Sequence, residues 1–113
     1  MAYRDNITDY GFGQMGSILI TGDTNAVTPN GVTGMEKHVF VAITFLEDTV
    51  FDNAGLTSAD NTKFPNDTTA GTGIDANGGA VTDGVEFPRG ITIYGRWTSI
   101  LLDSGKVIAY LGY

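Results

Sequence analysis

The segment that most constrains the fold is the C-terminal run of residues 85–113, and especially the tripeptide Asp103, Ser104 and Gly105 within it. Three apolar residues precede this tripeptide, and Lys106, Val107 and Ile108 follow it. Three loop residues that close on glycine are typical of a β-hairpin, because glycine adopts the left-handed backbone conformation without a steric penalty. We therefore expect a hairpin here, and we expect residues 85–113, with the single tryptophan Trp97, to form the core of a sheet.

Apolar spacing predicts strands along much of the remaining chain. Residues 38–47 carry apolar side chains at both sets of alternating positions, which is typical of a central strand covered on both faces. Residues 15–21 are interpreted as a second buried strand. Gly95 lies in the middle of a long strand expected after Gly90, and a glycine there indicates a bulge or a close backbone approach. No stretch longer than two turns keeps helical spacing, so we expect no substantial helix.

Residues 52–84 differ in composition from the rest. Of these 33 residues, 23 are Asp, Asn, Ser, Thr, Gly or Pro. Such a stretch buries little apolar surface, and loops of this length in compact domains are usually functional or disordered. Phe64 and Pro65 in its middle are interpreted as an anchor that holds the loop to another part of the molecule.

These patterns predict one all-β domain over residues 1–113, built as an antiparallel β-sandwich or a small, jelly-roll-like barrel. We divide it into an extended N-terminal arm (residues 1–14), a long loop rich in Asx, Gly and Thr (residues 52–84) and C-terminal core strands (residues 85–113). The low charged fraction of 17% and the 16 glycines favour short strands joined by tight turns.

Charge and hydropathy exclude several classes of partner. The net charge is −7, and no two of the 6 basic residues are adjacent, so binding to a phosphate backbone is disfavoured. The acidic charge serves solubility, or else docking onto a basic or cation-coated surface. No apolar run approaches the roughly 20 residues that span a bilayer. The N-terminal residues also lack the order of a signal peptide, so we expect synthesis in the cytoplasm and no membrane contact.

Catalytic and cofactor chemistry find little support in the sequence. His38 is the only histidine, and we interpret it as a residue at the start of a strand that makes an ordinary hydrogen bond. A small β-barrel hydrolase that uses His38 and a nearby carboxylate remains a third hypothesis, and Glu36, Glu47 and Glu86 are possible members of a carboxylate pair. No phosphate-binding glycine loop is present, and we expect no cofactor.

A weak calcium candidate lies in the polar loop. Asp75 and Asn77, followed by Gly78, resemble the beginning of a calcium-binding loop. However, Gly79 occupies the position of the next oxygen ligand, and Asx turns in a solvated loop produce the same composition. We therefore expect no metal.

The sequences of residues 86–99 (EFPRGITIYGRWTS) and residues 105–110 (GKVIAY) resemble small virion proteins of tailed bacteriophages, especially those of marine and cyanobacterial phages. Among these, the small, acidic, cysteine-free all-β type is most similar to capsid decoration (cement) proteins. The resemblance implies a non-enzymatic protein on the outer surface of the virion. It also implies that the protein binds the lattice of the major capsid protein, stabilises the particle and forms a homo-oligomer, with a trimer favoured.

Aromatic residues dominate the energetics of interfaces, so we expect the partner contacts at the aromatic residues of the arm and the loop. Both elements could instead fold back on their own domain. The alternative function is a fibre or tail-tip module that recognises a host surface glycan. The expected contact residues are Tyr3, Tyr10, Phe12, Phe64 and Pro65.

Overall fold

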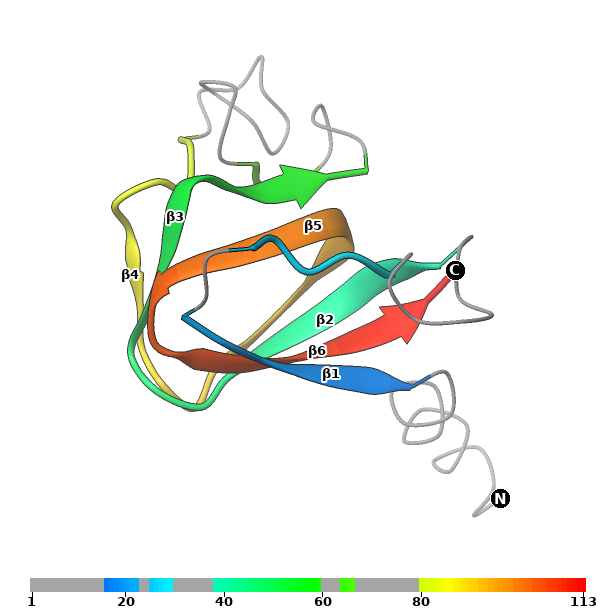
Figure 1. Ribbon diagram of the computed structural model, residues 1–113, viewed down its shortest axis with the longest axis horizontal. Helices are drawn as coiled ribbons and strands as arrows, with labels where there is room; N and C mark the ends of the chain where they lie inside the picture. The colour runs from blue at the N-terminus through cyan, green and yellow to red at the C-terminus, as the bar shows by residue number, and fades with distance from the viewer. Residues whose placement is uncertain (1–15, 23–24, 30–37, 60–63, 67–79) are drawn as a thin grey trace.

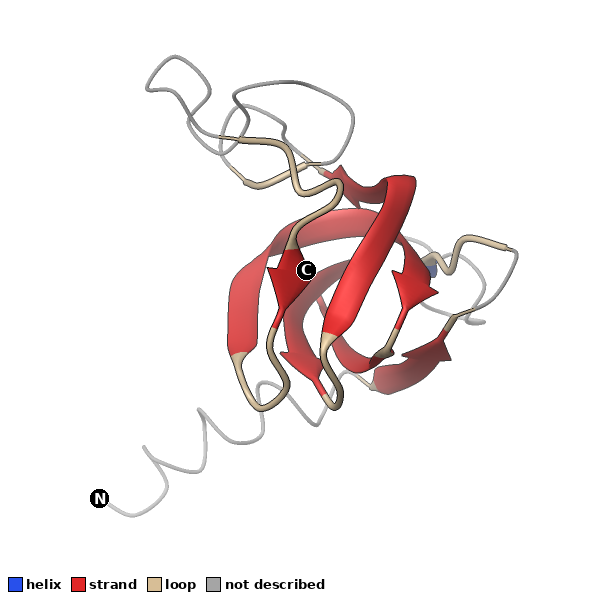
Figure 2. Cartoon of the chain, turned by 90° about the vertical axis from the view of Figure 1, so that its left-hand side faces the viewer, coloured by secondary structure: helices blue, strands red, loops and turns tan. Residues whose placement is uncertain are grey.

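The computed structural model describes residues 16–22, 25–29, 38–59, 64–66 and 80–113 (Figure 1). Its strands are β1 (Ser17–Thr21), β2 (Val39–Phe45), β3 (Thr49–Ser58), β4 (Glu86–Phe87), β5 (Thr92–Ser104) and β6 (Lys106–Gly112). They form one antiparallel sheet in the order β1-β6-β2-β5-β3-β4. The sheet curls around a single core (Figure 2), which confirms the expected all-β class.

β2 lies between β6 and β5, so the expectation of a central strand is confirmed. Phe40, Ile43 and Phe45 point into the core cluster. Ala42 points to the opposite face and is nevertheless fully buried. Ala42 is buried because it is small and lies between the larger side chains of Tyr94 and Tyr110, so a second covering layer over β2 is not present among the described residues.

β5 bends back on itself, and this bend gives the sheet its curl. The N–H of Phe45 donates to the carbonyl of Ile91 just before β5, whereas Ser104 at its other end pairs with Val50. Phe45 is the last residue of β2 and Val50 lies at the beginning of β3, so only a short connection separates them. Both ends of β5 therefore lie beside this connection. A straight strand of 13 residues would hold its ends about 40 Å apart, so β5 has to reverse (Figure 1).

The bend occurs where the sequence predicted an irregularity. Between Trp97 and Tyr94 the register against β2 shifts, because β5 carries an extra residue in this interval. A Cβ added to Gly95 would lie 2.8 Å from two ring carbons of Trp97. Gly95 therefore permits both the bulge and the close approach of the Trp97 ring, and the burial of Trp97 is confirmed.

The expected hairpin around Gly105 is wrong, although the tight turn itself is present. Gly105 has φ 98°, and a Cβ there would lie 2.7 Å from the carbonyl oxygen of Asp48. The strands on either side of the turn do not pair with each other, because β2 lies between β5 and β6 in the sheet. β5 pairs here with β3, while β6 pairs with β1 and β2. The turn therefore connects two sides of the curled sheet.

The expected start of the polar loop at residue 52 is also wrong. β3 continues to Ser58, with an interruption between the pairs Phe51–Leu102 and Leu56–Ile100. Phe51 and Leu56 are buried in the core, whereas the four residues between them form a bulge in which Ala54 has φ 58°. This bulge explains why the segment has the composition of a loop although it belongs to a strand.

Phe64, Pro65 and Asn66 attach the polar segment to the sheet, so the anchor prediction is confirmed. The indole N–H of Trp97 donates to the carbonyl of Pro65 at 2.9 Å. Asn66 is only 3% exposed, and its side-chain oxygen accepts a hydrogen bond from the N–H of Ser58 at 3.2 Å. Phe64 is half-buried beside Gly95, so it folds back on its own domain.

Candidate functional site

The outer side of β1, β6, β2 and the first half of β5 presents a continuous surface that we call the open face. Cross-strand pairing aligns its residues in two rows, each of which takes one residue from every strand. None of the side chains in these two rows is charged; the next row on the same side, Thr21 and Lys106, carries the charge of Lys106. The open face consists of Ser17, Tyr110, Ala42 and Tyr94 in one row, and Leu19, Ile108, Thr44 and Thr92 in the other.

Strand alternation separates the open face from the core. Ile20, Val107 and Ile43 point inward and belong to the core cluster. Their neighbours along the same strands point outward, since successive side chains in a strand lie on opposite faces. Leu19 is 62% exposed and Tyr94 is 63% exposed. The open face is therefore a sheet surface with large side chains in contact with solvent.

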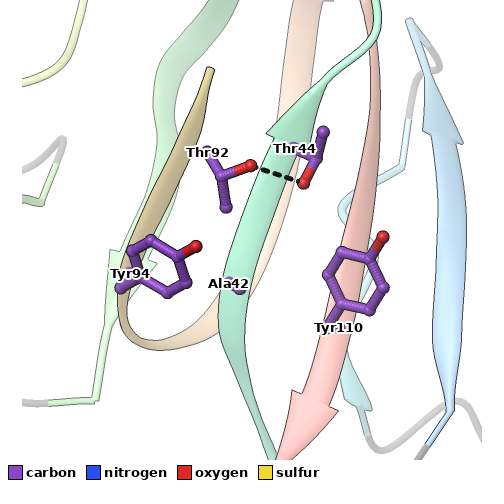
Figure 3. A pocket seen from close by; sticks show the side chains of 5 residues that line it. All are labelled: Ala42, Thr44, Thr92, Tyr94 and Tyr110. Carbon is purple, nitrogen blue, oxygen red and sulfur yellow. Dashed lines mark hydrogen bonds between the residues drawn. The ribbon is translucent and has the colours of Figure 1, made fainter. Parts of the chain in front are cut away.

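A shallow pocket of about 190 Å³ lies at the centre of the open face (Figure 3). The small Ala42 lies between the rings of Tyr94 and Tyr110, which stand on β5 and β6. The hydroxyl oxygens of Thr44 and Thr92 lie 2.8 Å apart and share a hydrogen bond. The pocket thus offers two aromatic rings and a pair of hydroxyl groups, which suits the binding of an uncharged group better than acid–base chemistry.

The candidate catalytic histidine, His38, does not lie beside Glu47, the carboxylate that follows the next strand. His38 lies just before β2, and Glu47 lies beyond its other end, where it forms an ion pair with Lys106 at 3.4 Å. The imidazole ring of His38 instead packs on the ring of Tyr113, with centroids 4.5 Å apart. Neither ring nitrogen has a hydrogen-bond partner within the part of the chain that the structure describes, so the expected ordinary hydrogen bond is not made to these residues.

Several expected contact and metal residues are not located. Tyr3, Tyr10, Phe12, Asp75 and Asn77 lie outside the described residues. Among the described residues, no group of three His, Cys, Asp or Glu side chains is arranged to hold a metal ion. The described segments also contain no helix that is long and apolar enough to cross a membrane. Of the predicted contacts, only Phe64 and the exposed Pro65 are placed.

The open face was missed from the sequence because residues 85–113 were interpreted as scaffold only. The scaffold interpretation is correct for the inward residues, since Trp97, Ile100 and Leu102 are buried. The outward residues Thr92 and Tyr94 alternate with inward ones, and this alternation was the available signal. The sequence does not reveal that β6, β2 and β5 lie side by side with their tyrosines on one surface.

Comparisons with known proteins do not assign this surface. No protein-family model matches the chain, and no match was found among curated proteins or solved structures. A functional proposal therefore depends on the geometry and chemistry of the open face itself.

Proposed function

We propose that this protein is a non-enzymatic structural protein of a tailed-phage virion, and specifically a capsid decoration protein that stabilises the particle. The observation that carries this proposal is the uncharged open face of a chain whose net charge is −7. Leu19 and Tyr94 are both more than three-fifths exposed on it. Depletion of charge and enrichment in aromatic residues are features of the buried centre of protein interfaces.

The construction of the open face suits repeated docking on a lattice. Its side chains stand on four strands that are joined by backbone hydrogen bonds, so binding orders little additional structure. The acidic residues lie elsewhere on the chain and keep the free protein soluble. On a lattice of the major capsid protein, contacts of modest affinity become collectively strong when many copies or linked copies bind.

The segment that resembles virion proteins also builds this surface. Residues 86–99 and 105–110 contribute most of β5 and β6, which supply half of the strands of the open face. Tyr94 and Tyr110 both belong to these motifs. The resemblance and the geometry therefore both support β5 and β6 as the strands that dock on the capsid.

The proposal is tested with capsids of the phage whose genome encodes the chain. The protein added to capsids that lack it should cosediment with them and raise the temperature at which they break open. Tyr94→Lys places a charge at the centre of the open face and should weaken cosedimentation at least 10-fold. Val85→Lys is the matched control, because Val85 is an exposed apolar residue outside the open face.

Two results would contradict the proposal. The first is a location of the protein at the tail, or its absence from purified virions, in cryo-electron microscopy and mass spectrometry. The second is cosedimentation of the Tyr94→Lys variant that equals that of the unmodified protein, which would remove the open face as the docking surface.

The second candidate function is that of a fibre or tail-tip module that binds a host surface glycan. It is favoured by the pocket of about 190 Å³, because tyrosine rings beside Ala42 can stack on a sugar and the threonine hydroxyls can hydrogen-bond to it. A saccharide array should then show binding that Tyr94→Ala abolishes and Val85→Ala leaves unchanged. An array without any signal contradicts this second candidate.

A further inference from the structure

β1 forms one edge of the sheet and has a single strand neighbour, β6, among the described residues. The N–H of Leu111 donates to the carbonyl of Gly16 at 2.9 Å, immediately before β1 begins. In an antiparallel ladder the residues that bond to the neighbouring strand alternate with residues that do not. Ile18 and Ile20 therefore direct their backbone groups to β6. Ser17, Leu19 and Thr21 direct theirs to the outer edge.

The residues along this outer edge are exposed. Ser17, Leu19 and Thr21 are all exposed, and Leu19 is 62% exposed. Within the described segments no strand pairs with their outward N–H and C=O groups. An edge of this kind is a template for pairing with another strand.

β1 also lacks three of the features by which proteins prevent edge pairing, namely proline, charge and a bulge. The sequence of Ser17–Thr21 contains no proline and no charged residue. Its register with β6 runs without a bulge over the whole strand. Since Lys, Pro and bulges are the usual protection of an exposed edge, the sequence of β1 is permissive for pairing.

We propose that β1 pairs with β1 of a second copy of this chain, antiparallel and across a two-fold axis at Leu19. The outward positions are symmetric about Leu19, so each strand is complementary to itself. Leu19 then faces Leu19 of the second copy, and Ser17 faces Thr21 of the second copy. Every outward N–H and C=O group of the three residues finds a partner, and the open faces of the two copies become continuous.

The absence of charge on β1 makes this edge compatible with a second copy of the chain. Two chains of net charge −7 repel each other, so their contact has to avoid acidic residues. β1 has no ionisable side chain. The Lys106 side chain, which stands opposite Thr21 on β6, forms an ion pair with Glu47 at 3.4 Å. The pairing requires only the folded chain, and it is independent of the capsid proposal.

The first test measures the mass of the purified protein by light scattering and sedimentation over a range of concentrations. The mass should rise with concentration from 12.0 kDa to twice this value. Leu19→Pro removes only an outward N–H, so it keeps the ladder to β6 and should lower the dimerisation constant at least 10-fold. Leu19→Lys should do the same. Tyr94→Lys is the matched control, because Tyr94 is equally exposed on the open face, and it should dimerise normally.

The second test reports the register directly. The chain has no cysteine, so Leu19→Cys introduces a single thiol. Residues that face each other in a hydrogen-bonded antiparallel pair have Cα atoms about 5.5 Å apart, which lies within disulfide range. Mild oxidation should convert this variant to a covalent dimer, whereas Tyr94→Cys should remain monomeric. In the unmodified dimer, amide exchange at Leu19 and Thr21 should slow with concentration, while exchange at Ile18 should not change.

Several outcomes would overturn the proposal. A monomer at every concentration up to about 1 mM, where association is worth only about 4 kcal/mol, is one of them. A trimer is another, since a two-fold pair closes at two copies. A dimer that persists in both Leu19→Pro and Leu19→Lys, or that is lost only when residues 1–15 are deleted, would assign the contact to a different surface.

Discussion

Gly95→Ala tests the contact on which the bend of β5 depends. The new Cβ would lie 2.8 Å from two ring carbons of Trp97 and 3.2 Å from Cδ1 of Phe64. The Trp97 ring is completely buried and its N–H is bonded to Pro65, so the ring cannot move away without losing that bond. Overpacking of this kind costs about 1–3 kcal/mol. The lower conformational entropy of alanine in the unfolded chain offsets about 0.4–1 kcal/mol of this cost.

The net destabilisation expected for Gly95→Ala is therefore about 1–2 kcal/mol. For a domain of this size it corresponds to a decrease in Tm of roughly 4–8 °C. The fluorescence of Trp97, the only tryptophan, and far-UV circular dichroism both follow the unfolding.

Gly22→Ala provides the control for Gly95→Ala. A Cβ at Gly22 would meet only the carbonyl oxygen of Asp103, at an ordinary 3.7 Å. This variant should be neutral or slightly stabilised. A Tm of Gly95→Ala that equals or exceeds that of Gly22→Ala would refute the packing of Trp97 over Gly95.

Two further variants probe the turn and the anchor. Gly105→Ala should lower the free energy of unfolding by about 3 kcal/mol or more, because the residue has φ 98° and its Cβ would overlap Thr49 and the backbone of Asp48. A denaturant midpoint close to that of the unmodified protein would contradict this expectation. Trp97→Phe removes the donor to Pro65 and leaves a small cavity, so it should cost about 2–3 kcal/mol, measured by circular dichroism. It should also accelerate amide exchange at Ser58, whose N–H donates to the side chain of Asn66. Unchanged exchange at Ser58 would show that the attachment of residues 64–66 does not depend on Trp97.

Strands with a strong apolar pattern were predicted correctly from the sequence. The pairing between strands that are distant in the sequence was not. β2 has apolar residues on both faces, and its central position followed from this pattern. The turn at Gly105 was also recognised, because the steric requirement for glycine is local. The partner strands of that turn were assigned wrongly, since nothing local distinguishes a hairpin from a turn that connects two sides of a curled sheet.

The candidate site was predictable in its residue types but not in its assembly. Alternation around Ile93 marks Tyr94 as an outward residue, and Tyr110 alternates in the same way on β6. Their position on either side of Ala42 results from the sheet order β6-β2-β5, which joins segments far apart in the chain. The polar residues of β3 were mistaken for loop residues because a bulge has the composition of a turn.

The sequence by itself determined the all-β class, the inward burial of Trp97, the irregularity at Gly95 and the anchoring role of Phe64 and Pro65. These features depend on side-chain alternation and on the special backbone freedom of glycine, which act over a few residues. Only the tertiary structure decided which strands are neighbours, that β5 reverses and that β1 presents an unprotected edge. These features depend on contacts between distant segments, where burial of the common core selects one pairing among many that are locally equivalent.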